Sequence, residues 1–226
     1  MNLTLLRPLT AELVGTALFV FLGAGSVVVS AAFPGAIGVI GVAAAHGIGL
    51  AVLVSATMNV SGGHLNPAVT IGLFAARKID AKTAGAYVAA QLVGAILGAA
   101  FVTWFLPAGA VNVTNAGLPA VAAAVTGKQA VALEALLTFV LMSAVIGTAV
   151  SKDAPKIGGF GIGLAVFAAS IVGGPLTGAA LNPARAFGPA LVAWEFQAQG
   201  LYWVAPVLGA TLAAVLWKFV LLPKEP

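Results

Sequence analysis

The chain has 226 residues, of which 61% are hydrophobic and 7% are charged. Because a soluble domain carries about 25% charged residues, this composition excludes an ordinary soluble fold and predicts a surface that mostly faces lipid. The net charge of +4 comes from ten scattered basic residues that form no dense face for nucleic acid, and a chain without cysteine has no disulfide or thiolate metal site.

Six apolar stretches are long enough to cross a bilayer as helices, which takes about 20 residues. In chain order they are expected near 9–31, 37–58, 84–106, 129–150, 157–174 and 200–222. The first is interpreted as a span and not as a removable signal peptide, because Glu12 lies inside it and no cleavage pattern follows. The predicted fold class is therefore an all-α membrane protein.

Two further segments are mildly apolar but too short to span. One runs from Asn66 to about Ala76 and would be about 16 Å long as a helix, roughly half of the hydrocarbon thickness. The other begins at Asn182. Both are predicted to be re-entrant half-helices.

Charge asymmetry predicts the orientation. With six spans, both chain ends share one side of the membrane with the second and fourth loops, and the opposite side holds only Lys128 and Arg185. The positive-inside rule therefore places both termini in the cytoplasm, and we expect a plasma (inner) membrane protein. The eight basic residues on the predicted cytoplasmic side are Arg7, Arg77, Lys78, Lys82, Lys152, Lys156, Lys218 and Lys224.

The sequence repeats itself at offsets of 114 to 122 residues. The run GIGLAV occurs at 47–52 and again at 161–166, and Tyr87 corresponds to Tyr202. The segment SGGHLNPAVTIG at 61–72 is similar to TGAALNPARAFG at 177–188. Each unit holds three spans and one half-span, and an odd number of spans inverts the second copy relative to the first. We expect one channel domain over 1–226, with inverted repeats at about 1–107 and 126–226 joined by the loop 108–125.

The Asn-Pro-Ala tripeptide, present in both repeats, is typical of a helix start. Asn is a favoured N-cap, and Pro is favoured at the first helical position. Two such starts meeting at the midplane would present positive helix-dipole ends and side-chain amides, which repel cations and donate hydrogen bonds to a passing oxygen atom. The predicted pore motifs are Asn66, Pro67, Ala68, Asn182, Pro183 and Ala184.

The residues before each motif are expected to be extended, with carbonyl groups free to line a wet pore. These predicted lining residues are Gly62, Gly63, His64, Leu65, Gly178, Ala180 and Leu181, and His64 is also interpreted as support for its loop.

The paired motifs HLNPAVT and LNPARAFGPA resemble those of the aquaporin and glycerol-facilitator family, and the similarity covers essentially the whole chain. The resemblance implies an hourglass-shaped monomer with its own pore, a homotetramer, no cofactor and no metal. It also implies that Glu12 and Glu134 accept hydrogen bonds from the re-entrant loops. The four filter residues that it implies are His46, Ser170, Ala179 and Arg185.

This filter departs from that of strict water channels, which have an aromatic residue in the second span and a His in the fifth. It resembles the filter of plant vacuolar aquaporins, although those usually carry Ile where this chain has Ser170. The small pair Ser170 and Ala179 should widen the constriction. We therefore expect a passive water channel that excludes protons and ions and also leaks small neutral solutes.

Three other functions are conceivable for such a chain. A facilitator for glycerol, urea, ammonia or hydrogen peroxide is the main alternative, but Ala186 and Tyr202-Trp203 replace the Asp and Pro usual in glycerol facilitators. A proton-coupled secondary transporter would use buried acids such as Glu12 and Glu134, although their duplication favours scaffolding. An enzyme is not expected, because the sequence has no recognisable catalytic triad, metal-binding cluster or phosphate-binding loop.

Overall fold

The computed structural model describes residues 3–222 and is helical, with no strand in that range. Within those residues, six helices are long and apolar enough to cross a membrane. They are α1 (Leu3–Ala32), α2 (Gly38–Ser61), α4 (Ala81–Phe105), α6 (Gly127–Val145) extended by η1 (Ile146–Val150), α7 (Phe160–Thr177), and α9 (Gln199–Leu216) extended by η2 (Trp217–Leu221). The predicted all-α fold with six spans is confirmed; the charge at Lys224 lies outside the described residues.

Two helix ends differ from the sequence-based bounds for the same physical reason. The second and fifth spans were expected to end near 58 and 174, but α2 continues to Ser61 and α7 continues through Pro175 to Thr177. The helices end where Gly62 and Gly178 adopt left-handed backbone angles, with φ of 92° and 79°. Glycine occupies this conformation without steric cost, so each helix continues as far as its glycine.

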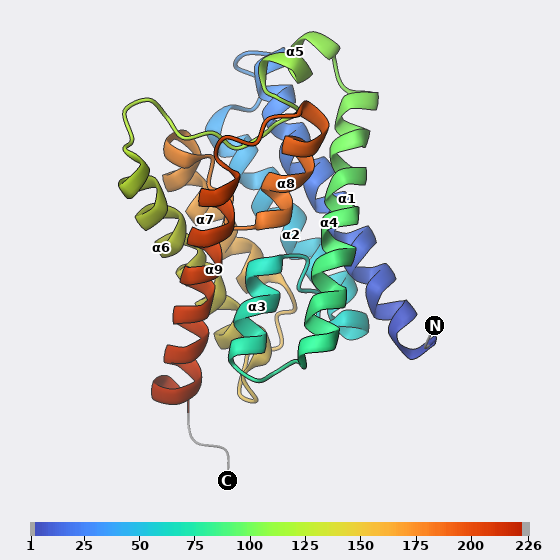
Figure 1. Ribbon diagram of the computed structural model, residues 1–226, viewed down its shortest axis with the longest axis vertical. Coiled ribbons are helices and arrows are strands. Elements are labelled where there is room, and N and C mark those ends of the chain that lie inside the picture. The colour runs from blue at the N-terminus through green and yellow to red at the C-terminus, as the bar shows by residue number, and fades with distance from the viewer. Residues whose placement is uncertain (1–2, 223–226) are drawn as a thin grey trace.

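The two half-helices enter the molecule from opposite ends. Figure 1 shows α3 (Pro67–Ala75) in the half where α1 begins and α9 ends, and α8 (Pro183–Ala193) in the other half. We call the first the terminal end and the second, which carries α5, the distal end. Lys218 donates a hydrogen bond to the Ala76 carbonyl at the end of α3, where a cation complements the helix dipole.

Helix packing follows the inverted repeat. The contact of α1 with α4 corresponds to that of α6 with α9, and the contact of α3 with α9 corresponds to that of α8 with α4. The helices α2 and α7, equivalent in the two repeats, pack against each other between these pairs. The predicted inverted arrangement of six spans and two half-helices is thereby confirmed, while the exact repeat bounds remain a prediction.

The predicted loop 108–125 is partly structured. It contains the short helix α5 (Ala108–Val113) at the distal end, which Figure 1 shows above the bundle. The residues after α5 turn back toward the bundle, and Ala122 N–H donates to the Leu176 carbonyl at 2.9 Å. The segment that connects the two repeats therefore packs on the distal end of the bundle.

Candidate functional site: two cavities and the paired half-helix starts

Both half-helices begin where the Asn-Pro-Ala motifs predicted. The Asn66 side-chain oxygen accepts from the backbone N–H of Ala68 at 2.8 Å, and the Asn182 oxygen accepts from Ala184 N–H at 2.9 Å. Pro67 and Pro183 occupy the first helical positions, where a missing N–H is harmless. Each start therefore has its first donors partly satisfied by the cap, with the positive end of the helix dipole beside it.

The two caps are tied to each other across the repeat. The Asn66 amide donates to the Leu181 carbonyl at 3.0 Å, and the Asn182 amide donates to the Leu65 carbonyl at 2.8 Å. Both side chains are nearly fully buried, at 4% and 2% exposed. An amide group has two hydrogens, so one hydrogen on each Asn remains after the cross-repeat bond is made.

The segments before the two motifs are not extended, and that prediction is wrong. Gly62, Gly63 and Leu65 have φ values of 92°, 62° and 49°. Their counterparts Gly178, Ala179 and Leu181 have φ values of 79°, 43° and 51°. The left-handed turns direct successive N–H groups toward one buried carboxylate in each repeat, which an extended strand would not do.

In the first repeat that carboxylate belongs to Glu12 on α1. Its Oε1 accepts from Ser61 Oγ at 2.6 Å and from His64 N–H at 3.0 Å. Its Oε2 accepts from Leu65 N–H and from the Gln91 amide, both at 2.7 Å. Glu12 is fully buried, so these four donors replace the water that a buried charge requires.

Glu134 on α6 repeats this arrangement with three donors. Its Oε1 accepts from Thr177 Oγ1 at 2.7 Å and Ala180 N–H at 2.9 Å, and its Oε2 accepts from Leu181 N–H at 2.9 Å. Tyr202 donates to the Thr177 carbonyl at 2.7 Å, as Tyr87 does to Ser61 at 2.9 Å in the first repeat. Duplicated residues thus hold the two loops in the same way.

Two cavities lie on opposite sides of this junction. The distal cavity has a volume of about 450 Å³ and is lined by His46, Ser170, Gly178 and Arg185, among others. The terminal cavity has a volume of about 300 Å³, and its lining includes Gly62, Gly63, His64 and Asn66. His64 also contacts Thr70 Oγ1 through Nδ1 at 3.1 Å. No group of three metal-ligating side chains occurs in the described part of the chain.

Other predicted pore residues are engaged elsewhere. The carbonyls of Leu65 and Leu181 were expected to be free but accept from the opposite Asn side chains. Ala180 packs against Ala186 and Tyr202 instead of lining either cavity. Ala179 is buried beside Gly178 and is absent from the lining of the distal cavity. Leu65, Ala179 and Leu181 have left-handed backbone angles, so their groups do not take the orientation that an extended strand would give them.

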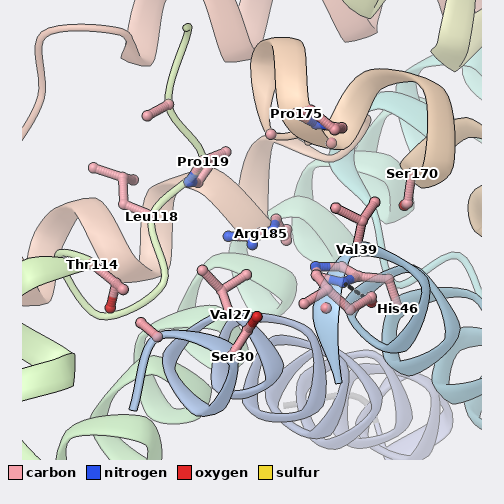
Figure 2. A pocket seen from close by; sticks show the side chains of 16 residues that line it. Val27, Ser30, Val39, His46, Thr114, Leu118, Pro119, Ser170, Pro175 and Arg185 are labelled. Carbon is pink, nitrogen blue, oxygen red and sulfur yellow. Dashed lines mark hydrogen bonds between the residues drawn. The ribbon is translucent and has the colours of Figure 1, made fainter. Parts of the chain in front are cut away.

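Three predicted filter residues do converge on the distal cavity, as Figure 2 shows for His46, Ser170 and Arg185. They come from α2, α7 and α8, which are distant in sequence. Among the described residues, His46 Nε2, Ser170 Oγ and Arg185 Nε have no hydrogen-bond partner. These three atoms are buried, so the residues that line the cavity keep polar atoms that no other protein group satisfies.

The loop after α5 supplies lining residues that the sequence reasoning missed. Thr114, Leu118 and Pro119 line the distal cavity (Figure 2). The Gly117 carbonyl accepts from Arg185 Nη1 at 2.8 Å and so holds the guanidinium in place. Gly117 has φ of 75°, and a side chain here would lie 2.3 Å from the Ala24 carbonyl oxygen. The glycine at position 117 was the one available sign of this close approach in the sequence.

Six membrane-length helices enclose two half-helix starts, which lie between two cavities. This arrangement defines a membrane channel built from an inverted repeat. The sequence comparison identifies which kind. The chain belongs to the family described as Major intrinsic protein, whose pattern matches residues 1–217.

Individual relatives agree with that family. The chain is 43% identical over 221 residues to aquaporin TIP4-4 of Zea mays, covering 93% of this chain and 85% of the relative. It is 38% identical over 219 residues to aquaporin-5 of Mus musculus, covering 95% and 81%. The fold matches the X-ray structure of the aquaglyceroporin from Plasmodium falciparum with a TM-score of 0.86, 24% identity and 96% coverage of both chains.

Proposed function

We propose that this chain is a passive water channel that excludes protons and ions and leaks small neutral solutes. The observation that carries the proposal is the pair of Asn-capped half-helix starts, joined through the Asn66 and Asn182 side chains between two cavities. The relatives named as aquaporins, from a plant and from a mammal, support water as the main permeant. Conduction needs no chemical step and no cofactor.

At the junction, the remaining amide hydrogens of Asn66 and Asn182 would donate to the oxygen of a permeating water. A water held in this way points its own hydrogens away from the junction, which interrupts a chain of hydrogen bonds along which a proton could pass. The two positive dipole ends add a repulsive field for any cation. Neutral molecules with an accepting oxygen are thus favoured over hydronium and metal ions.

At the distal cavity, Arg185 would act as a fixed positive charge and donor, held by Gly117. His46 and Ser170 would complete the constriction. Because Ser170 is small and its buried hydroxyl lacks a protein partner, this side of the constriction should admit a solute larger than water. Urea, ammonia and hydrogen peroxide are the candidate secondary permeants, and glycerol facilitation is the alternative main function.

A secondary transporter built from the same inverted repeat would place titratable groups at its substrate site. Here both buried carboxylates accept bonds from loop backbone: Glu12 from His64 and Leu65, and Glu134 from Ala180 and Leu181. We therefore propose scaffolding roles for Glu12 and Glu134. Flux that is unchanged by a pH or sodium gradient would support the channel.

We also propose a homotetramer in the plasma membrane with the terminal end in the cytoplasm. The basic residues that follow α3 and η1, together with Lys218 in η2, support this orientation. Native mass spectrometry of the detergent-solubilised protein tests the assembly, and protease protection of a terminal tag in intact cells tests the orientation. A monomer, or a tag cleaved from outside, would contradict them.

Stopped-flow light scattering of proteoliposomes tests the main proposal. Shrinkage in an impermeant osmolyte reports water flow, and re-swelling in urea or glycerol reports solute entry. We expect rapid shrinkage with a low activation energy, slower re-swelling in urea and almost none in glycerol. Re-swelling in glycerol as fast as shrinkage would instead identify a glycerol facilitator.

A further inference from the structure

The imidazole of His46 is seated against the backbone of Gly23 on α1. A Cβ atom added to Gly23 would lie 2.7 Å from both Cδ2 and Nε2 of the ring and 3.2 Å from Cε1. Non-bonded atoms in a protein core do not approach this closely. The ring therefore occupies the space that any side chain at position 23 would need.

Further contacts hold the ring in this recess. Its Nδ1 lies 2.9 Å from the Val42 carbonyl, and because a carbonyl only accepts, Nδ1 carries the proton. Phe19, one turn before Gly23 on α1, meets the ring edge to face at a centroid distance of 6.1 Å. His46 is only 4% exposed, although it lines the distal cavity.

The open space next to the ring is that cavity, which His46 shares with Arg185 in Figure 2. A side chain at position 23 would push the ring away from α1, while the Nδ1 bond keeps it on the same turn of α2. The displaced ring would enter the cavity and approach Arg185. The bare backbone at Gly23 thus keeps this part of the constriction wide.

We propose that Gly23 is a specificity-determining residue of the pore, which sets the width of the constriction by letting His46 withdraw against α1. This inference rests on the proposed channel function and adds a position on α1 to the predicted filter. Gly23 sets the width of the constriction through His46 and does not line the cavity itself. Its effect falls on neutral solutes larger than water, for which urea is the probe.

The test compares Gly23→Ala with Gly25→Ala in proteoliposomes. Gly25 lies on the same helix, but an added Cβ there would meet side chains of Leu106 and Val102 at 3.5 and 3.8 Å, which are ordinary contact distances. We expect Gly23→Ala to lower the ratio of urea to water permeability at least about threefold, because pore diameter governs solute selectivity. Gly25→Ala should leave the ratio unchanged. If the unmodified channel passes no urea, the same comparison is made on water permeability, which the displaced ring also reduces.

His46→Ala provides the background that isolates the ring. Without the imidazole, adding Gly23→Ala should change neither permeability, and if the single variant fails to fold, the double variant should recover folding. Equal ratios in Gly23→Ala and the unmodified channel would overturn the inference, as would an equal loss in the His46→Ala background. Failure of both the single and the double variant to fold would also overturn it. The proposed function fails separately, if the unmodified protein conducts no water.

Discussion

At the scale of single residues, Arg185 is a buried charge whose position is fixed by its neighbours. It is 1% exposed, follows directly on the second Asn-Pro-Ala motif, and is held by the Gly117 carbonyl at the wall of the distal cavity. A buried guanidinium with so little protein compensation is costly. We propose that this cost is offset by the role of Arg185 in repelling cations and orienting neutral permeants.

Removing this charge together with the ring should open the channel to larger or charged species. In Arg185→Val with His46→Ala, we expect proton or urea permeability to rise severalfold while water flow persists, because the barrier and the constriction are both lost. A pH-sensitive dye inside proteoliposomes measures the proton flux.

Lys128→Gln is the matched control for that variant, because it removes an exposed basic residue at the start of α6 without touching either cavity. Unchanged selectivity in the double variant would refute the assignment of Arg185 and His46 to the filter.

The buried glutamates make a second prediction at this scale. In Glu134→Gln, one carboxylate oxygen becomes an amide that faces backbone N–H or hydroxyl donors, so we expect stability to fall by about 1–3 kcal/mol. Thermal unfolding in detergent measures the change. Glu195→Gln is the control, because its exposed bond from Gln197 N–H survives the substitution; an equal loss in both variants would argue against a special role for Glu134.

At the scale of elements, the half-helices depend on their caps more than on their length. The short helix α3 has nine residues and α8 has eleven, which is below the length at which a helix is stable alone. Their starts are fixed by Asn66 and Asn182, each of which caps its own helix and bonds to the opposite loop. The junction is therefore a single unit formed from two elements.

Substituting one cap should reveal this coupling. In Asn182→Ala, the buried N–H groups of Ala184 and Arg185 lose their acceptor and the Leu65 carbonyl loses its donor. We expect stability to fall by at least about 1 kcal/mol more than in Thr126→Ala, which removes an exposed cap from α6 whose donors then bond to water. Thermal unfolding of both variants in the same detergent decides this, and equal losses would contradict the coupling.

Elements whose signals are local were predictable from the sequence. Hydropathy located the six spans, and the cap chemistry of Asn-Pro located Pro67 and Pro183 as helix starts. The path of the loop after α5 was not predictable, because it depends on the tertiary contact of Gly117 with α1. The same is true of Leu65 and Leu181, whose carbonyls accept hydrogen bonds from the Asn side chain of the opposite repeat.

At the scale of the whole molecule, the inverted repeat explains why one chain has two cavities and one junction. The equivalent helices α2 and α7 pack against each other, and the two half-helices meet from opposite ends. The repeats are not identical at the site, since Arg185 and the loop after α5 belong only to the distal cavity. The two repeats thus share a backbone arrangement but contribute different residues to the two cavities.

The most direct test measures water and proton flow together in proteoliposomes that contain a pH-sensitive dye. Osmotic shrinkage in the stopped flow gives the water permeability, and an imposed pH step gives the proton permeability of the same vesicles. We expect water permeability to increase in proportion to protein content, while proton permeability stays at the level of protein-free liposomes. A proton permeability that rises along with the water permeability would contradict the proposed role of the paired half-helix starts.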